Sequence, residues 1–316
     1  MNSGPSPARE FMGTQQAFLG FSDWGATRRG RNRKTAPAGD APEEAVMMPF
    51  TRSRWAIRLV AFALGAVAPA FPARISAQGM MSGVDLNTPA FTQAELSRAD
   101  IEGLIAKLKP GQKLDLAGKS LNALDLSKLD LQGADLRGAR LNHANLSGAD
   151  LRGAVLDDVW ALGADLSGAD LSGARLFGAQ MLHARFDRAD LSGARLAGDF
   201  TGAHFAGAKL AGADGSADMK NQSMGLMHAV MRSADLRGAD LARADFSRAD
   251  LEFAQLNDAD LSRADLSHAD VAGADLRGAR LEGANLDGAD VASAHIDAAA
   301  AKNFSRAINL DRALKD

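Results

Sequence analysis

The chain has 316 residues, of which 46% are hydrophobic and 24% are charged, and its formal net charge at pH 7 is −3. It contains no cysteine, which excludes a disulfide framework, a thiol nucleophile and a lipid anchor on cysteine. Residues 111–316 carry a net charge of about −7, against about +4 for residues 1–110. Because binding to phosphates needs a basic surface, we predict no direct nucleic-acid binding.

The N-terminal part has the layout of an exported protein. Residues 1–47 show no apolar period and are expected to form a disordered extension, which a translation start at Met47 or Met48 would leave out. Residues 48–77 have the basic flank, apolar run and small-residue end of a signal peptide. The apolar run is shorter than the roughly 20 residues of a membrane span, so a retained anchor is the weaker interpretation. We predict a periplasmic or secreted protein, cleaved near Ala77 and without stable membrane insertion.

A linker over 78–91 is expected to lead into a helix over 92–110. Thr92 and Glu95 have the spacing of a capping box, in which two side chains satisfy backbone amides at a helix start. Apolar residues follow at helical spacing, and Pro110 and Gly111 are typical of a helix end. This pattern predicts an N-terminal capping helix.

The sequence then repeats itself every five residues, as in ADLSGADLSGARL at 164–176. Fourteen of the seventeen residues spaced by five from 116 to 196 are Leu, and a second block runs from 231 to 296. A helix would spread these side chains around its whole circumference, and a flat strand would send them to alternate faces. A short extended segment followed by a corner keeps them all on one side, so the period predicts a solenoid.

The unit Ala-Asp/Asn-Leu, followed by two mostly polar residues, resembles the pentapeptide-repeat family over 114–210 and 229–296. The resemblance implies an all-β solenoid, a right-handed four-sided β-helix with four repeats in each coil. We expect this domain to occupy 111–210 and 229–298. The repeat centres would fill its core, among them Leu136, Leu146, Leu166, Leu176, Phe186, Leu236, Phe246 and Leu276.

The period is disturbed between the two blocks and again at the end of the chain. It slips by one residue at Asp199–Phe200, which we interpret as a local bulge, and it is absent over 211–228, which predicts a protruding loop. Residues 299–316 are expected to form a C-terminal cap or tail. A weaker helical pattern over 297–314 would supply a C-terminal capping helix.

Few residues indicate chemistry. The six histidines are scattered, no metal-ligand or nucleophile motif is present, and a filled core leaves little room for a substrate. We therefore predict a protein that is not an enzyme and needs no cofactor or metal. The Met residues near 211–228 could suit Cu(I), but adaptable packing and partner contact are the stronger interpretations. The candidate partner-binding residues are Trp160, Phe177, Met219, Met224 and Met227.

Aspartates at the outward repeat position form two series with a spacing of twenty: Asp130, Asp150, Asp170 and Asp190, then Asp250, Asp270 and Asp290. They are expected to stack in columns, and their simplest role is to accept hydrogen bonds from nearby turn amides. Some relatives use an acidic rod to imitate DNA and to protect DNA gyrase. The predicted function is an exported, non-enzymatic interaction scaffold for an unknown protein partner, with a homodimer left open. The alternative is a DNA-mimicking binder of a type II topoisomerase.

Overall fold

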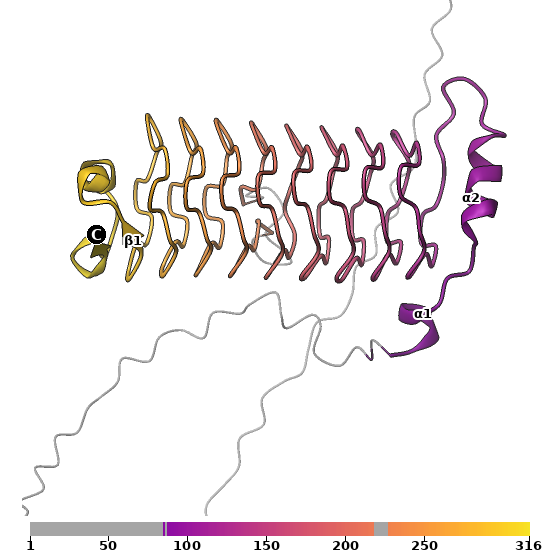
Figure 1. The fold of residues 1–316 in the computed structure, drawn as a ribbon, viewed down its shortest axis with the longest axis horizontal. Coiled ribbons are helices and arrows are strands. Elements are labelled where there is room, and N and C mark those ends of the chain that lie inside the picture. The colour runs from indigo at the N-terminus through magenta and orange to yellow at the C-terminus, as the bar shows by residue number, and fades with distance from the viewer. Residues whose placement is uncertain (1–84, 86, 218–226) are drawn as a thin grey trace, which may run out of the picture. The chain divides into compact units, whose positions relative to one another are not determined.

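The computed structural model describes residue 85, residues 87–217 and residues 227–316, all within the compact unit Ala70–Asp316. Their backbone forms a stack of coils between α2 (Arg98–Ile105) and the C-terminal elements (Figure 1). Parallel bridges join residues twenty apart, such as Asp130 with Asp150. Bridged positions recur every five residues, so each coil contains four repeats and has four sides. The predicted signal peptide and the N-terminal extension lie outside the described residues.

One repeat shows how a period of five makes a corner. Leu166 points inward, its amide donates to the carbonyl of Arg185 in the next coil at 2.7 Å, and Arg185 donates back to Ala164 at 2.9 Å. The chain then turns at Gly168, which has a φ of 64°, and the amide of Ala169 closes the turn on the Leu166 carbonyl at 3.0 Å. Each side contributes one bridged residue before the turn, so the described two-residue strands are confined to β1 (His295–Ile296) and β2 (Leu314–Lys315).

The core is a column of inward alanines and larger apolar side chains. All eight core centres named from the sequence are at most 2% exposed: Leu136, Leu146, Leu166, Leu176, Phe186, Leu236, Phe246 and Leu276. The repeat centre Ala161 is small, and the inward residue two positions before it, Val159, is larger than the usual alanine; both are fully buried. Such compensation keeps the volume of the coil nearly constant, which close packing requires.

The coil that ends near residue 198 is one residue short, and it contains no bulge. Gln180 pairs with Asp199, nineteen residues on, and the pairing continues without a gap from Arg185 to His204. An added Cβ on Gly198 would lie 2.6 Å from the carbonyl oxygen of Ala179, so the shortened corner requires glycine. The predicted bulge is wrong, because a bulge adds a residue whereas this corner lacks one.

The insertion begins later than the sequence pattern indicates. Asp214 still pairs with Arg195 below and with Asp245 above, thirty-one residues on. Gly215 occupies a core centre, where an added Cβ would lie 2.6 Å from the ring of Phe246. Residues 211–215 therefore belong to the coil. They lack the leucine pattern because Phe246 fills the space above Gly215.

Two helices, and not one, precede the first coil. Thr92 ends α1 (Pro89–Thr92), and its hydroxyl donates to the carbonyl of Thr88 at 3.1 Å. The cap of α2 is Ser97, whose Oγ accepts from the amide of Asp100 at 3.2 Å while the Asp100 carboxylate accepts from the amide of Ser97 at 2.8 Å. The predicted cap at Thr92 is thus displaced by five residues, and α2 ends at Ile105.

The backbone between the two helices explains this displacement. Ala94 forms an antiparallel bridge with Leu121, and the amide of Glu95 donates to the carbonyl of Ser120 at 2.9 Å. These residues are held extended, so α2 cannot start before Ser97. After it, Ile101 is fully buried in the core cluster.

The position of the cap predicts the effects of two substitutions. Ser97→Ala is expected to lower the free energy of unfolding by about 1 kcal/mol, because it removes an N-cap acceptor. Thr92→Ala is expected to cost less than about 0.5 kcal/mol, since Thr92 caps no helix. Urea unfolding of the two variants tests this, and a larger loss in Thr92→Ala would contradict the cap at Ser97.

The C-terminal end is built from short elements. After β1, the chain forms two 3₁₀ helices, η2 (Ala298–Phe304) and η3 (Leu310–Arg312), and then β2, which pairs with β1 in parallel. Phe304 is fully buried. The predicted α-helix over 297–314 is absent from these described residues, because the last residues continue the pairing of the coils.

Candidate interaction surfaces

Most outward aspartates serve the turn that follows them. The Asp165 carboxylate accepts from the amide of Ser167 at 2.9 Å, and the same bond recurs two residues after many other aspartates. These bonds satisfy a backbone amide at each corner that follows an aspartate. The acidic composition of the repeats is therefore accounted for by turn geometry.

Some of these carboxylates also bind an arginine on the same turn. The guanidinium of Arg137 binds Asp135, and this hydrogen bond lowers the pKa of Asp135 below its usual value of 3.8. Partial burial opposes the shift, and the hydrogen bond from the Arg137 amide adds to it. Arg152 lowers the pKa of Asp150, and Arg237 lowers that of Asp235, in the same way. The ionised form is favoured in the folded chain.

These lowered pKa values predict the acid stability of the coil. A carboxyl whose pKa is lowered on folding contributes stability above its unfolded value, and this is lost as the pH falls through the folded value. The melting temperature is therefore expected to be nearly constant from pH 7 to about pH 5 and to fall below about pH 4. Thermal unfolding across this range checks this expectation. If the melting temperature fell mainly between pH 7 and pH 5, protonation of histidines, and not of aspartates, would account for the loss.

On one side of the first coils, asparagine replaces this arrangement. The bridged residues there are Ser120, Arg140 and Trp160, which do not supply a carboxylate. Instead, Asn122 accepts from the amide of Asn142 in the next coil at 3.0 Å, and Asn142 accepts from the amide of Leu162 at 3.0 Å. Both asparagines are buried, at 3% and 4% exposed. A side chain from the coil below thus replaces the missing aspartate.

The same asparagines hold the segment around α1. Asn122 Nδ2 donates to the carbonyls of Ala90 and Gln93, at 3.1 and 3.2 Å, and Asn142 Nδ2 donates to that of Phe91 at 3.3 Å. A depression of about 250 Å³ lies beside them and is lined by Asn87, Phe91, Thr92, Asn122, Ala123, Asn142, His143 and Leu162. Residues that the sequence placed in a linker therefore bind the side of the coils.

Trp160 contacts this segment. The rings of Phe91 and Trp160 meet edge to face with centroids 5.1 Å apart, and Trp160 is half-buried. Phe177 is also half-buried, and its amide donates to Asp157 at 3.1 Å. Among the described rings, Trp160 makes its ring contact with Phe91 and not with Phe177. The sequence analysis missed Phe91, which has no repeat pattern to place it.

The methionine candidates are only partly covered by the structure. Met219 and Met224 lie outside the described residues, and Met227 is half-buried. Met231 fills a core centre and is fully buried. Within 87–217 and 227–316, no group of three or more His, Asp or Glu side chains could hold a metal ion.

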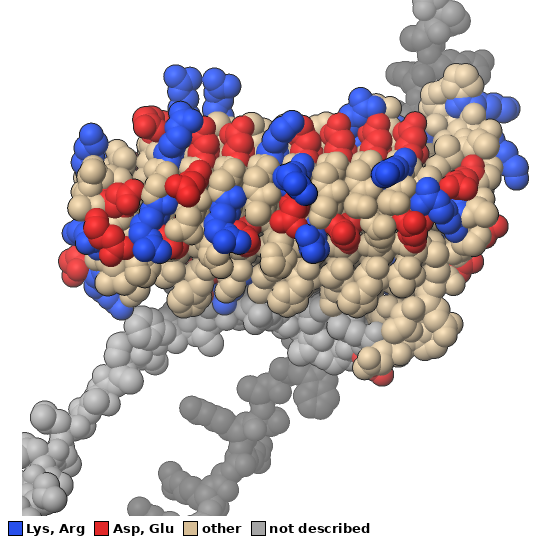
Figure 2. Space-filling view, viewed as in Figure 1, with Lys and Arg blue, Asp and Glu red and all other residues tan. Residues whose placement is uncertain are grey.

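The two acidic series lie on opposite sides of the coil. Asp190 stacks with Lys209 and then with Asp240, so the first series continues into Asp260 and Arg280. Asp250 instead stacks above Val230 and Asp199, on the side that carries Trp160. The short corner and the insertion shift the second block by two sides. Figure 2 shows acidic rows along one face of the rod, with basic side chains among them, most densely toward the C-terminal coils.

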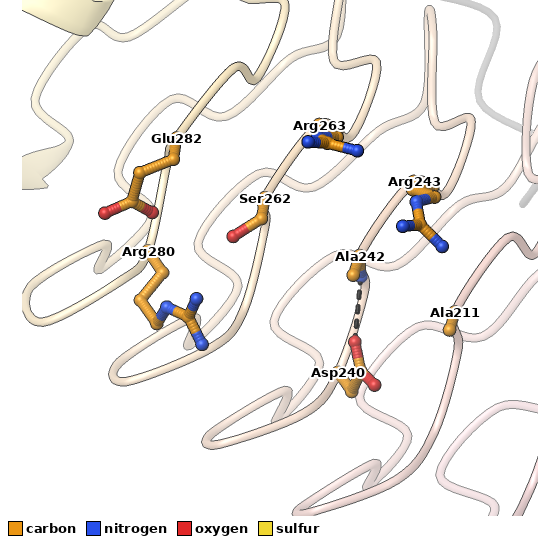
Figure 3. Close-up of a pocket in the computed structure, with 8 residues that line it drawn as sticks. All are labelled: Ala211, Asp240, Ala242, Arg243, Ser262, Arg263, Arg280 and Glu282. Carbon is orange, nitrogen blue, oxygen red and sulfur yellow. Dashed lines mark hydrogen bonds between the residues drawn. The ribbon is translucent and has the colours of Figure 1, made fainter.

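A second depression, of about 460 Å³, lies on the side that carries Asp240 and Asp260. Its lining consists of Ala211, Asp240, Ala242, Arg243, Ser262, Arg263, Arg280 and Glu282. Figure 3 shows Arg243 and Arg263 on successive coils along one edge, with Asp240 and Arg280 along the other. Sequence analysis did not single out these arginines, although two successive coils carry Arg where most corners carry Gly.

Across the part of the chain that the structure describes, no helix is both long and apolar enough to cross a membrane.

Comparisons with known proteins agree with the coil geometry. The family model described as pentapeptide repeats matches in eight copies, over residues 120–158, 163–198, 226–263 and 259–295. No curated protein sequence matches the chain.

Several solved structures are similar. HetL from the cyanobacterium Nostoc, a pentapeptide repeat protein involved in heterocyst differentiation regulation, is 30% identical, with 62% of this chain and 97% of HetL covered and a TM-score of 0.34. QnrB1, a plasmid-mediated fluoroquinolone resistance protein, is 20% identical, with 58% and 84% covered and a TM-score of 0.32. A pentapeptide repeat protein of the Arabidopsis thaliana thylakoid lumen is 28% identical, with 45% and 74% covered and a TM-score of 0.25.

Proposed function

Since the chain belongs to the pentapeptide-repeat family, we propose that it is an exported scaffold that binds another protein and has no enzymatic activity of its own. The observation that carries this proposal is the filled interior of the coil. Inward Ala and Leu side chains of successive coils are buried against one another from Leu116 to Ile296. A ligand would therefore be recognised from outside the coil.

The outer surface is suited to such recognition because it is rigid and regular. Backbone bonds join each coil to the next, and aspartates fix the corner amides. Outward side chains at the same position of successive coils then form columns, and neighbours within one column are about 4.8 Å apart. We also propose that α2 covers the first coil and that η2, η3 and β2 cover the last one, since the ends of a solenoid need such cover.

The proposed partner surface includes Trp160 and Phe177, together with the methionines near the insertion. Trp160 is partly covered by Phe91, so its exposed edge and the segment around α1 would be recognised together. Phe177 lies in the coil after Trp160, around a corner. Aromatic side chains of this kind are enriched at the centres of protein interfaces.

Two measurements test the proposal. Mass spectrometry of the native protein in fractionated cells is expected to find a mature N-terminus near Gln78 in the envelope or secreted fraction. Affinity capture is then expected to recover a partner with the wild type and less of it with Phe177→Ala. An uncleaved chain in the cytosol would contradict export, and equal capture by both proteins would contradict the surface.

The DNA-mimic alternative has weaker support. It draws on the acidic column from Asp130 to Asp190, but Lys209 and Arg280 interrupt this column, and the second acidic series lies on the opposite side. A supercoiling assay with purified gyrase distinguishes the two functions. Inhibition or protection at stoichiometric protein would favour the alternative, and no effect would favour the scaffold.

A further inference from the structure

The corners of the coil follow a rule for large side chains. At the corner position the backbone φ is near 60°, and a large side chain there is followed one coil later by glycine. This holds for His143 and Gly163, and for Arg188 and Gly207. An added Cβ on Gly163 would lie 2.9 Å from the His143 ring, so the side chain needs the space that glycine leaves.

Arg243 breaks this rule, because Arg263 occupies its corner one coil later, and glycine follows only after Arg263, at Gly283. Both have a φ of 60°, and they occupy the same corner on successive coils, so one large side chain follows another. Arg248 and His268 do the same at the next corner of the same two coils. A left-handed backbone is unfavourable for residues other than glycine, but the corners of the coil share it, so these two pairs differ from the other corners only in placing one large side chain directly above another.

Neither arginine of the pair is held by a carboxylate of the described residues, although Asp240 and Glu282 line the same depression. Arg280 lies in the same depression and binds Asp260 at 3.1 Å, whereas Arg243 and Arg263 form no ion pair or side-chain hydrogen bond among the described residues. Their backbones are one coil apart, about 4.8 Å, so the two guanidinium groups extend from neighbouring positions on one edge (Figure 3). Like charges so close repel each other unless an anion lies between them.

We propose that Arg243 and Arg263 form a binding site for a phosphate group. Two unpaired guanidinium groups match the charge of a dianionic phosphate, and each can donate two parallel hydrogen bonds to its oxygens. The floor beside them consists of Ala242, Ser262 and Ala211, which leaves room for such a group. Asp240 and Glu282 also line the depression and would repel an anion, so the phosphate would have to lie against Arg243 and Arg263 and away from these carboxylates. This inference does not depend on the proposed partner surface.

The phosphate could be free or carried by a lipid headgroup, and both sources can be tested on the full chain. The probes are inorganic phosphate, followed by isothermal titration, and vesicles of phosphatidylcholine with phosphatidic acid, followed by co-sedimentation. The site variant is Arg243→Gly with Arg263→Gly. The matched control is Lys128→Gly with Arg188→Gly, which removes the same charge from two left-handed corners, each followed by glycine.

The wild type and the control are expected to bind one phosphate with equal affinity, and the site variant at least about tenfold more weakly. Without phosphate, the site variant is expected to melt at the same or a higher temperature, because glycine relieves the backbone and the repulsion. Vesicle binding that is lost only in the site variant would support the site with lipid as the source. Equal loss in the control and the site variant, or no binding of either probe to the wild type, would overturn the proposal.

Discussion

Phe186→Ala is expected to lower the free energy of unfolding by about 3–5 kcal/mol, the largest effect of a single truncation in the described core. Phe186 is fully buried and stacks on Phe205 with centroids 4.6 Å apart, and both rings meet Phe200 edge to face at about 6 Å. Alanine would leave a cavity that the parallel coils cannot close, because backbone bonds fix their spacing. Urea unfolding followed by far-UV circular dichroism measures the loss.

Phe253→Ala supplies the control, because the residue type is the same and the environment differs. Phe253 is 59% exposed and occupies a corner with a φ of 59°, above Ser233 and below Gly273. Its truncation is expected to change stability by less than about 0.5 kcal/mol. A loss below about 1.5 kcal/mol in Phe186→Ala would show that the three rings are not packed as a rigid cluster.

The inward pattern was predictable because it is local and repeated many times. A residue such as Leu166 is specified by the alanine two residues before it and the turn that follows, so the period alone indicates which way it points. The slip at Asp199 was visible in the sequence, and so was its direction, because the centres Leu196 and Phe200 are four residues apart and a bulge would have made the step six. The interpretation as a bulge was therefore wrong already at the level of spacing, and the pairing of Gln180 with Asp199 confirms the missing residue.

The N-terminal segment was not predictable, because its structure depends on distant residues. The spacing of Thr92 and Glu95 predicted a cap there, whereas the structure has its cap at Ser97 and Asp100. The pairing of Ala94 with Leu121 decides between them. Likewise, nothing near Phe91 indicates that it will contact Trp160, sixty-nine residues further along the chain.

The placement of the two acidic series relative to each other was not predictable for a third reason. The missing residue near 198 and the insertion each shift the register of all later repeats. A spacing of twenty predicts a column only where no residue is gained or lost. Between Asp190 and Asp240 the chain advances two coils in fifty residues, so Asp250 reaches the opposite side. The same offsets place Arg243 and Arg263 above Gly212 on the corner beside the first acidic column.

Asn122→Leu is expected to lower the free energy of unfolding by about 2–3 kcal/mol and to release the segment around α1. Leucine fits the position, since Leu162 and Leu182 occupy the same place in later coils. The loss would therefore come from polar groups left without partners. The amide of Asn142 loses its acceptor, and the carbonyls of Ala90 and Gln93 keep only the hydroxyl of Ser120, whose single proton they would have to share.

Release of the segment removes Phe91 from the ring of Trp160 and exposes the indole to water. The difference between variant and wild-type fluorescence reports on Trp160, because the two other tryptophans lie before residue 78 and are unchanged. A red shift that precedes global unfolding in urea is expected for Asn122→Leu. Thr201→Leu, in the same column but with no partner for its hydroxyl, is expected to show neither shift nor loss. If the two variants behave alike, the asparagines do not hold the segment, and the surface around Trp160 is open to a partner without its help.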